Sequence, residues 1–180
     1  MKPISVSMGF TRGANFFPSG AIRYLDGGRY NHVYWKFHFN GGHALIYESH
    51  MSGGVQITPY EHLLSAKTKG KVLEIHEVDM GATSKEATLL WNDCIPLHHK
   101  GYDRARIMGY YAWIRFTRRE GKKVLNLHNK DRYTCNEFVV ETGRRGGIPL
   151  MDGIDFSYTI EPLYRLTHDG KSSTAIVPKK

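Results

Sequence analysis

The stretch from Tyr133 to Gly147, YTCNEFVVETGRRGG, constrains the fold most, because it predicts both ends of one helix. Thr134 is followed three residues later by Glu137. This is the spacing of a capping box, in which each side chain bonds to the other residue's backbone N–H group. The pair Gly146-Gly147 is typical of a helix C-terminus. We therefore expect a helix that begins after Thr134, with Cys135 as its first residue.

Cys135 has two interpretations at this position. The first turn of a helix has unpaired N–H groups at the positive end of the helix dipole, and both favour the thiolate, the nucleophilic form of cysteine. A catalytic cysteine also needs a base, usually a histidine supplied from elsewhere in the fold. The alternative is that Cys135 is a small buried apolar residue, as free cysteines often are.

The rest of the chain is predicted to form antiparallel strands first and helices afterwards. No repeat or linker interrupts residues 1–180, so we expect a single domain with a flexible tail after about residue 168. The expected strands are residues 4–10, 32–39, 43–49, 55–58 and 71–78, with a last edge strand at 163–166. The expected helices are residues 19–25, a turn at 59–64, a helix between Thr83 and Pro96, and 102–117.

The second cysteine, Cys94, belongs to an apolar stripe. Ala87, Leu90, Trp91 and Cys94 recur at i, i+3, i+4 and i+7, which is the pattern of one buried helix face. We therefore expect Cys94 to pack in the core and to take no part in chemistry.

The chain carries a formal net charge of +8, which suits an anionic partner such as nucleic acid, a membrane surface or a wall polymer. The basic residues are dispersed, apart from a cluster at 115–123 and Lys179-Lys180. We interpret that cluster as a solvated helix end and expect no specific nucleic-acid binding. The N-terminus lacks the apolar region of a signal peptide, and no apolar run is long enough to span a membrane. We expect a protein synthesised in the cytoplasm, with its site of action undetermined.

Of ten histidines, His32 has the most suggestive position, because it begins a predicted strand just after a turn-like segment. A side chain at a strand end can meet a helix N-terminus from another part of the chain. The metal motifs H-E-x-x-H and C-x-x-C are missing from the sequence, and so are G-x-S-x-G, G-x-G-x-x-G and the P-loop. We therefore expect neither a metal nor a cofactor.

A cysteine–histidine pair usually has a third group that orients the base. Glu48 and His43 are the two candidates, because both lie on the strand that returns past His32. A hairpin loop at Gly41-Gly42 would place Glu48 opposite Trp35 and His43 beside the turn, far from His32. Antiparallel geometry favours Glu48, although a bulge would reverse the choice.

Four segments together resemble a known family: GAIRYLDGGRYNHVYWKF, ALIYESHMSGGVQITPYEHL, YDRARIMGYYAW and YTCNEFVVETGRRGGI. The chain looks like the circularly permuted branch of the NlpC-type papain-like cysteine hydrolases, in which the histidine strands precede the cysteine helix. This branch includes amidase-like proteins, isopeptidases and the lecithin–retinol acyltransferase group. The resemblance spans residues 21 to 166. Asn136-Glu137-Phe138 after the cysteine is closer to the amidase type than to the acyltransferase type.

The resemblance implies an α+β fold in which an antiparallel sheet of about five strands packs against helices, a permuted papain-like cysteine hydrolase. It implies Cys135 as nucleophile, His32 as base and Glu48 as the third residue, with His43 as the acyltransferase-like alternative. The backbone N–H of Cys135 is a natural oxyanion donor, and Tyr133 or Tyr30 are candidates for a second.

The expected reaction is cleavage of an amide bond, peptide, isopeptide or N-acyl, through a thioester. The substrate would be a peptide, a peptidoglycan fragment or an acyl lipid. The sequence leaves open a non-catalytic binding module on the same fold, and an acyltransferase or lipid hydrolase. A basic nucleic-acid-binding or virion protein, suggested by the charge alone, is a further alternative.

Overall fold

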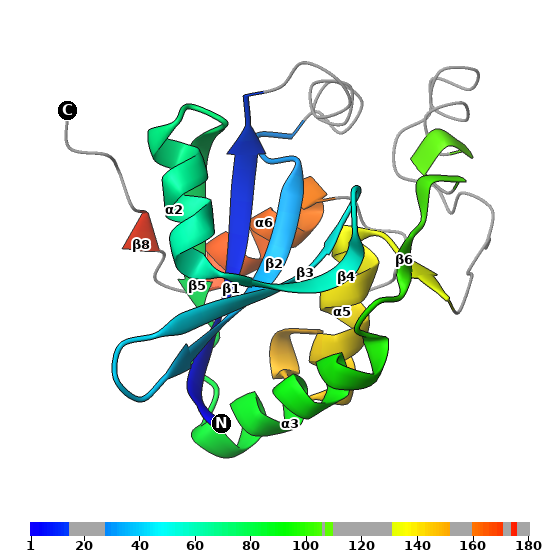
Figure 1. Ribbon diagram of the computed structural model, residues 1–180. Helices are drawn as coiled ribbons and strands as arrows, with labels where there is room; N and C mark the ends of the chain where they lie inside the picture. The colour runs from blue at the N-terminus through cyan, green and yellow to red at the C-terminus, as the bar shows by residue number, and fades with distance from the viewer. Residues whose placement is uncertain (15–27, 106, 110–130, 152–159, 171–173, 176–180) are drawn as a thin grey trace.

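We describe the chain from a computed structural model, which covers residues 1–14, 28–105, 107–109, 131–151, 160–170 and 174–175 (Figure 1). Its centre is an antiparallel sheet with the strand order β4-β3-β2-β1-β5, extended at one edge by the short β8. The long strands are β1 (Pro3–Gly13), β2 (His32–Phe39), β3 (Ala44–His50), β4 (Gly54–Pro59) and β5 (Val72–Asp79). The short ones are β8 (Thr174–Ala175) and a separate parallel pair, β6 (Gly101–Tyr102) and β7 (Arg132–Tyr133). The predicted α+β class, with about five antiparallel strands and helices, is confirmed.

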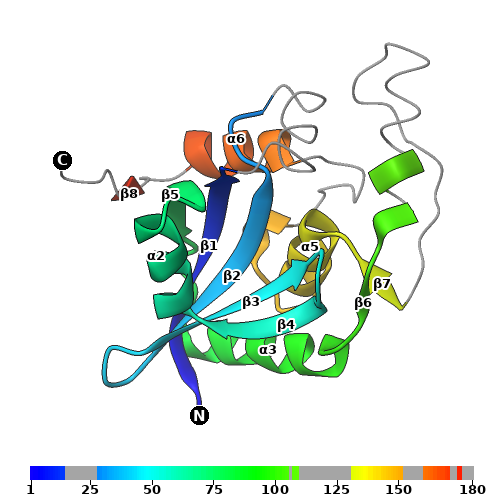
Figure 2. The ribbon, with the colours of Figure 1, turned by 45° about the horizontal axis from the view of Figure 1, so that its top comes forward.

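Helices cover both faces of the sheet, but unequally (Figures 1 and 2). The helices are α2 (Tyr60–Thr68), α3 (Ser84–Cys94), α5 (Cys135–Arg145) and α6 (Ile160–Gly170), with 3-10 turns at Ile95–Leu97 and Pro149–Met151. Side chains of α3, α5 and α6 pack on the face that carries Trp35 and Phe10. Helix α2 has no fully buried residue and contributes Tyr60 to the opposite face, over Lys36. The main core therefore lies between the sheet and the three-helix layer.

Helix α5 lies close against β2. The Trp35 indole N–H donates to Thr142 Oγ1 at 2.9 Å, and both residues are fully buried. At Gly143, a Cβ atom would lie only 2.8 Å from the Trp35 ring, so a glycine permits the approach. This contact fixes the helix that begins with Cys135 against the strand that begins with His32.

The helix boundaries agree with the capping analysis. Thr134 is the N-cap of α5 and forms a capping box with Glu137, while Gly146 is the C-cap. The same arrangement joins Thr83 and Glu86 at the start of α3, and α3 ends at Cys94, before Pro96. These local signals predicted both helices because the capping bonds form within four residues.

The β2–β3 register differs from the prediction by one residue. Trp35 pairs with Tyr47 and not with Glu48, because the loop has three residues, Asn40 to Gly42, instead of two. Both glycines of the loop have positive φ, 86° and 80°. The additional loop residue moves Glu48 one position further along the ladder, towards His32.

The prediction of an edge strand at Leu163–Leu166 is wrong, because these residues belong to α6. Ile160, Leu163 and Thr167 are buried at i, i+3 and i+7, and the ring of Tyr164 packs edge-on against Phe10 at 5.5 Å. This spacing is helical, and it becomes visible only when the window begins at residue 160. Helix α6 continues to Gly170 and Thr174–Ala175 pair with β5, whereas the rest of the tail that was predicted to be flexible lies outside the described residues.

Other predictions are modified or lie outside the described residues. Tyr102 is in β6, so the helix predicted from it begins later, at residue 104. The helix at 19–25, the basic cluster at 115–123 and the C-terminal lysines lie outside the described part of the chain. None of the described helices combines the length and the hydropathy that crossing a bilayer would require.

Gly9 provides a test of the packing between β1 and the Tyr34 side chain of β2. A Cβ atom there would lie 2.0 Å from Cζ of Tyr34, whose ring is fully buried and whose hydroxyl donates to Glu77 at 2.9 Å. Because the ring cannot retreat without breaking that bond, Gly9→Ala is expected to lower the free energy of unfolding by about 1–3 kcal/mol, measured by urea denaturation. Gly109→Ala adds the same methyl group at a position where no atom of the described residues lies within 4 Å, and it is the control. Equal stability of the two variants would contradict the packing.

Candidate active site

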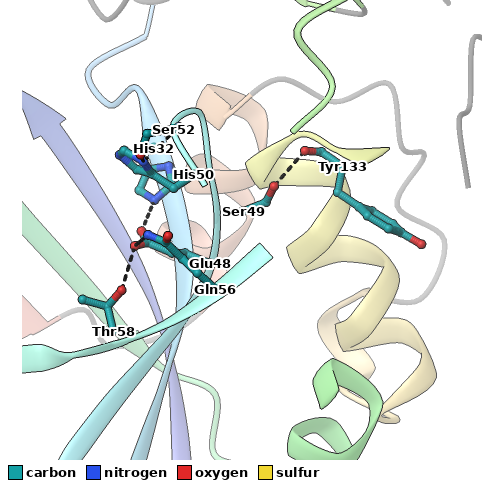
Figure 3. Close-up of polar contacts among 8 residues, drawn as sticks. All are labelled: His32, Glu48, Ser49, His50, Ser52, Gln56, Thr58 and Tyr133. Atoms are coloured by element: carbon teal, nitrogen blue, oxygen red, sulfur yellow. Dashed lines mark hydrogen bonds and ion pairs between the residues drawn. The ribbon is translucent and has the colours of Figure 1, made fainter. Parts of the chain in front are cut away.

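His32 and Glu48 form a close pair at the end of the sheet where β2 begins and β3 ends (Figure 3). Nε2 of His32 lies 2.6 Å from Oε2 of Glu48. The two side chains are 17% and 13% exposed, so the pair is largely shielded but reachable from solvent. The predicted choice of Glu48 as the partner of His32 therefore agrees with the geometry.

The second carboxylate oxygen of Glu48 is held by β4. Oε1 accepts hydrogen bonds from Nε2 of Gln56 at 3.0 Å and from Oγ1 of Thr58 at 3.4 Å (Figure 3). Burial raises the pKa of Glu48, but the bonds from His32 and Gln56 outweigh it and lower the pKa to about 2. Glu48 is therefore a fixed anion, which orients the His32 ring.

Cys135 is the first residue of α5 and is 5% exposed. Two hydrogen bonds fix Tyr133 and Thr134, the residues that precede Cys135. Glu137 Oε2 accepts the N–H of Thr134 at 3.0 Å, and the hydroxyl of Ser49, on β3, donates to the Tyr133 carbonyl at 2.7 Å. The bond from Ser49 ties the start of the cysteine helix to the strand that carries Glu48 (Figure 3).

The thiol of Cys135 lies close enough to the ring of His32 to affect the pKa of that ring. Burial lowers the pKa of His32, but the interactions with Cys135 and Glu48 outweigh it and raise the pKa to about 10. Since Nε2 faces Glu48, the remaining ring nitrogen, Nδ1, is the one available to Cys135. The three residues that the sequence singled out are thus brought together, from β2, β3 and α5.

The competing candidates lie elsewhere. His43 is exposed and follows the β2–β3 turn, at the opposite end of the strands from His32. Cys94 is fully buried in the core, as predicted, and burial raises the pKa of its thiol well above the usual value. Cys94 therefore lacks the access that a nucleophile needs.

Neither tyrosine suggested as an oxyanion donor is placed for that role. The Tyr30 hydroxyl donates to Glu74 on β5 at 3.0 Å. The ring of Tyr133 points away from the His32–Glu48 pair (Figure 3) and lies near Glu141, which raises its pKa after the larger effect of burial.

His50 is a residue at this site that the sequence reasoning passed over. Its ring packs edge-on against the ring of His32, with 5.8 Å between centroids and an 82° angle. A signal existed in the sequence: His50 follows Glu48 by two residues on a strand, so both side chains project from the same face. Among the described residues, the chain contains no group of three or more His, Cys, Asp or Glu that can hold a metal ion.

The pair makes stability depend on pH, and Glu48→Gln tests this dependence. The raised pKa of His32 contributes stability below pH 6.5, which is lost as the pH rises through about 10. The lowered pKa of Glu48 contributes stability above pH 4.5, which is lost as the pH falls through about 2. Wild type should exceed Glu48→Gln by about 2 kcal/mol between pH 4.5 and 6.5.

The measurement is urea denaturation of both proteins at pH 3, 5.5 and 9. The difference in unfolding free energy should be largest at pH 5.5. A difference that is the same at all three values would show that the pair is not ionised as described.

Comparison with known proteins gives no relative from which a role can be transferred. No protein-family model matches the chain, and a search of curated proteins finds no significant match. The contacts among His32, Glu48 and Cys135 are therefore the basis for assigning a function.

Proposed function

We propose that this protein is a cysteine hydrolase that cleaves an amide bond through a thioester on Cys135. The observation that carries the proposal is the His32 ring, which lies 2.6 Å from Glu48 and whose pKa is raised by both Cys135 and Glu48. This is the constellation of a nucleophile, a base and a group that orients the base. The resemblance of the four segments to permuted papain-like hydrolases agrees with it.

In the proposed reaction, His32 holds the proton of Cys135 and the sulfur attacks the carbonyl carbon of the substrate. The new C–S bond forms as the carbonyl π electrons move to oxygen. The C–N bond then breaks, and the leaving amine takes the proton from His32. Water, deprotonated by His32, afterwards hydrolyses the thioester and regenerates the thiol.

Glu48 supports this cycle by its charge. Because its pKa is about 2, it remains an anion throughout the neutral range and stabilises the imidazolium that forms during attack. Its bonds from Gln56 and Thr58 keep the carboxylate in place while the proton moves. The backbone N–H of Cys135, at the start of α5, is the first donor to the carbonyl oxygen.

The proposal predicts an activated thiol. In a Cys94→Ala background, iodoacetamide should alkylate Cys135 rapidly even at pH 6, because the neighbouring imidazolium stabilises the thiolate. His32→Ala should slow alkylation at pH 6 at least about tenfold. The rate is measured by mass spectrometry from pH 5 to 9.

His43→Ala is the matched control, because it removes an exposed imidazole distant from the site. If the alkylation rate has the pH dependence of an ordinary thiol, both with and without His32, the proposed enzyme activity is rejected and a binding module on this fold is favoured.

Turnover is tested with the three substrate classes that the chemistry allows: a muropeptide, an isopeptide and an N-acyl amino acid. Cys135→Ala should abolish cleavage of whichever substrate is hydrolysed. Its urea unfolding midpoint should shift no more than small core substitutions usually shift it. Release of amine by Cys135→Ala at the wild-type rate would reject Cys135 as the nucleophile. Transfer of the acyl group to an added amine, instead of to water, would identify an acyltransferase.

A further inference from the structure

The proposed reaction requires a second donor to the carbonyl oxygen, and the structure offers one at the end of β3. Oxyanion stabilisation normally uses two donors in fixed positions. The Tyr30 and Tyr133 side chains are directed elsewhere. Two polar side chains make ring contacts with His32, Tyr34 and His50. The Tyr34 hydroxyl donates to Glu77, which leaves His50, an exposed residue.

The hydrogen bonds of His50 define which nitrogen carries the proton. Nδ1 accepts the backbone N–H of Ser52 at 3.3 Å and lies 2.8 Å from the Ser52 hydroxyl. A nitrogen that accepts an N–H has no proton of its own, so the neutral ring carries its hydrogen on Nε2. Within the described part of the chain, Nε2 of His50 has no protein partner.

The turn that follows His50 holds the ring in place. The N–H of Gly53 donates to the His50 carbonyl at 3.2 Å, closing the turn. Arg104 donates to the Met51 carbonyl at 2.9 Å, and the N–H of Val55 donates to the Lys100 carbonyl at 2.8 Å. A donor supported in this way is already oriented before the substrate arrives, which is the condition for effective oxyanion stabilisation.

His50 also remains neutral where the enzyme is expected to work. Burial lowers the pKa of His50, and the positive charge of His32 lowers it further. A neutral imidazole N–H can polarise a carbonyl without bringing a competing charge beside the imidazolium of the base.

We propose that Nε2–H of His50 is the second oxyanion donor and therefore a catalytic residue. In the attack on the substrate, the electron pair that leaves the carbonyl π bond comes to rest on the oxygen between this N–H and the N–H of Cys135. This electron pair re-forms the carbonyl π bond when the C–N bond breaks and the leaving amine departs with the proton of His32. This role deepens the proposed hydrolase and rests on it.

The test compares two reactions of the same thiol in the Cys94→Ala background. Acylation of Cys135 by p-nitrophenyl acetate passes through a tetrahedral oxyanion, whereas alkylation by iodoacetamide occurs at a saturated carbon and forms none. His50→Phe retains an aromatic ring beside His32 but removes the N–H. It should slow acylation about 100-fold and change alkylation less than twofold, and His50→Gln, which restores an amide N–H, should recover part of the loss.

His62→Phe, at an exposed position on α2, is the matched control and should leave both rates unchanged. An equal loss of both reactions in His50→Phe would show that His50 only positions His32, and no loss in either would exclude it. Both results overturn the donor role and leave the hydrolase intact. Failure of the hydrolase is recognised separately, by a wild-type Cys135 that is not acylated and whose alkylation ignores His32. That result overturns the donor role as well.

Discussion

The contact between the start of α5 and the ends of β2 and β3 is the constraint on which the site depends. Cys135 lies 103 residues after His32 in the chain (135 − 32), and Glu48 lies on a third element, so no local sequence rule can align the three residues. Two bonds do so instead: Ser49 to the Tyr133 carbonyl, at the start of the helix, and Trp35 to Thr142, two turns later. One fixes the position of the helix start and the other its direction.

The sequence predicted the local features of this arrangement well, because they depend on neighbours in the chain. The capping boxes at Thr83 and Thr134, and the strand from His32 to Phe39, have the boundaries expected. The β2–β3 register was missed because a loop of two residues and one of three suit Gly41 and Gly42 equally well. The pairing is decided by which strand residues face the core, and Trp35 and Tyr47 are both fully buried there.

α6 and His50 were missed for the same reason: the helical conformation of one and the position of the other depend on tertiary contacts. Leu163 and Tyr164 lie in a short amphipathic stretch that becomes helical against Phe10 of the sheet. His50 is one of ten histidines and is distinguished only by its contact with His32 and by the Ser52 turn. Residue type and spacing singled out Cys135 and His32, whereas the electrostatic surroundings of His32 became visible only in the three-dimensional structure.

The electrostatics of the pair also argue against a purely structural role. A largely buried carboxylate and imidazolium lose hydration, and such pairs are often no more stabilising than apolar residues of the same size. Elsewhere in this sheet, the buried ion pair of Lys36 and Glu77 is enclosed by Tyr34 and Tyr60. The His32–Glu48 pair instead stands at the end of the sheet, partly exposed, and the Cys135 thiol affects the pKa of its histidine. A pair that served only the fold would need neither the opening nor the thiol.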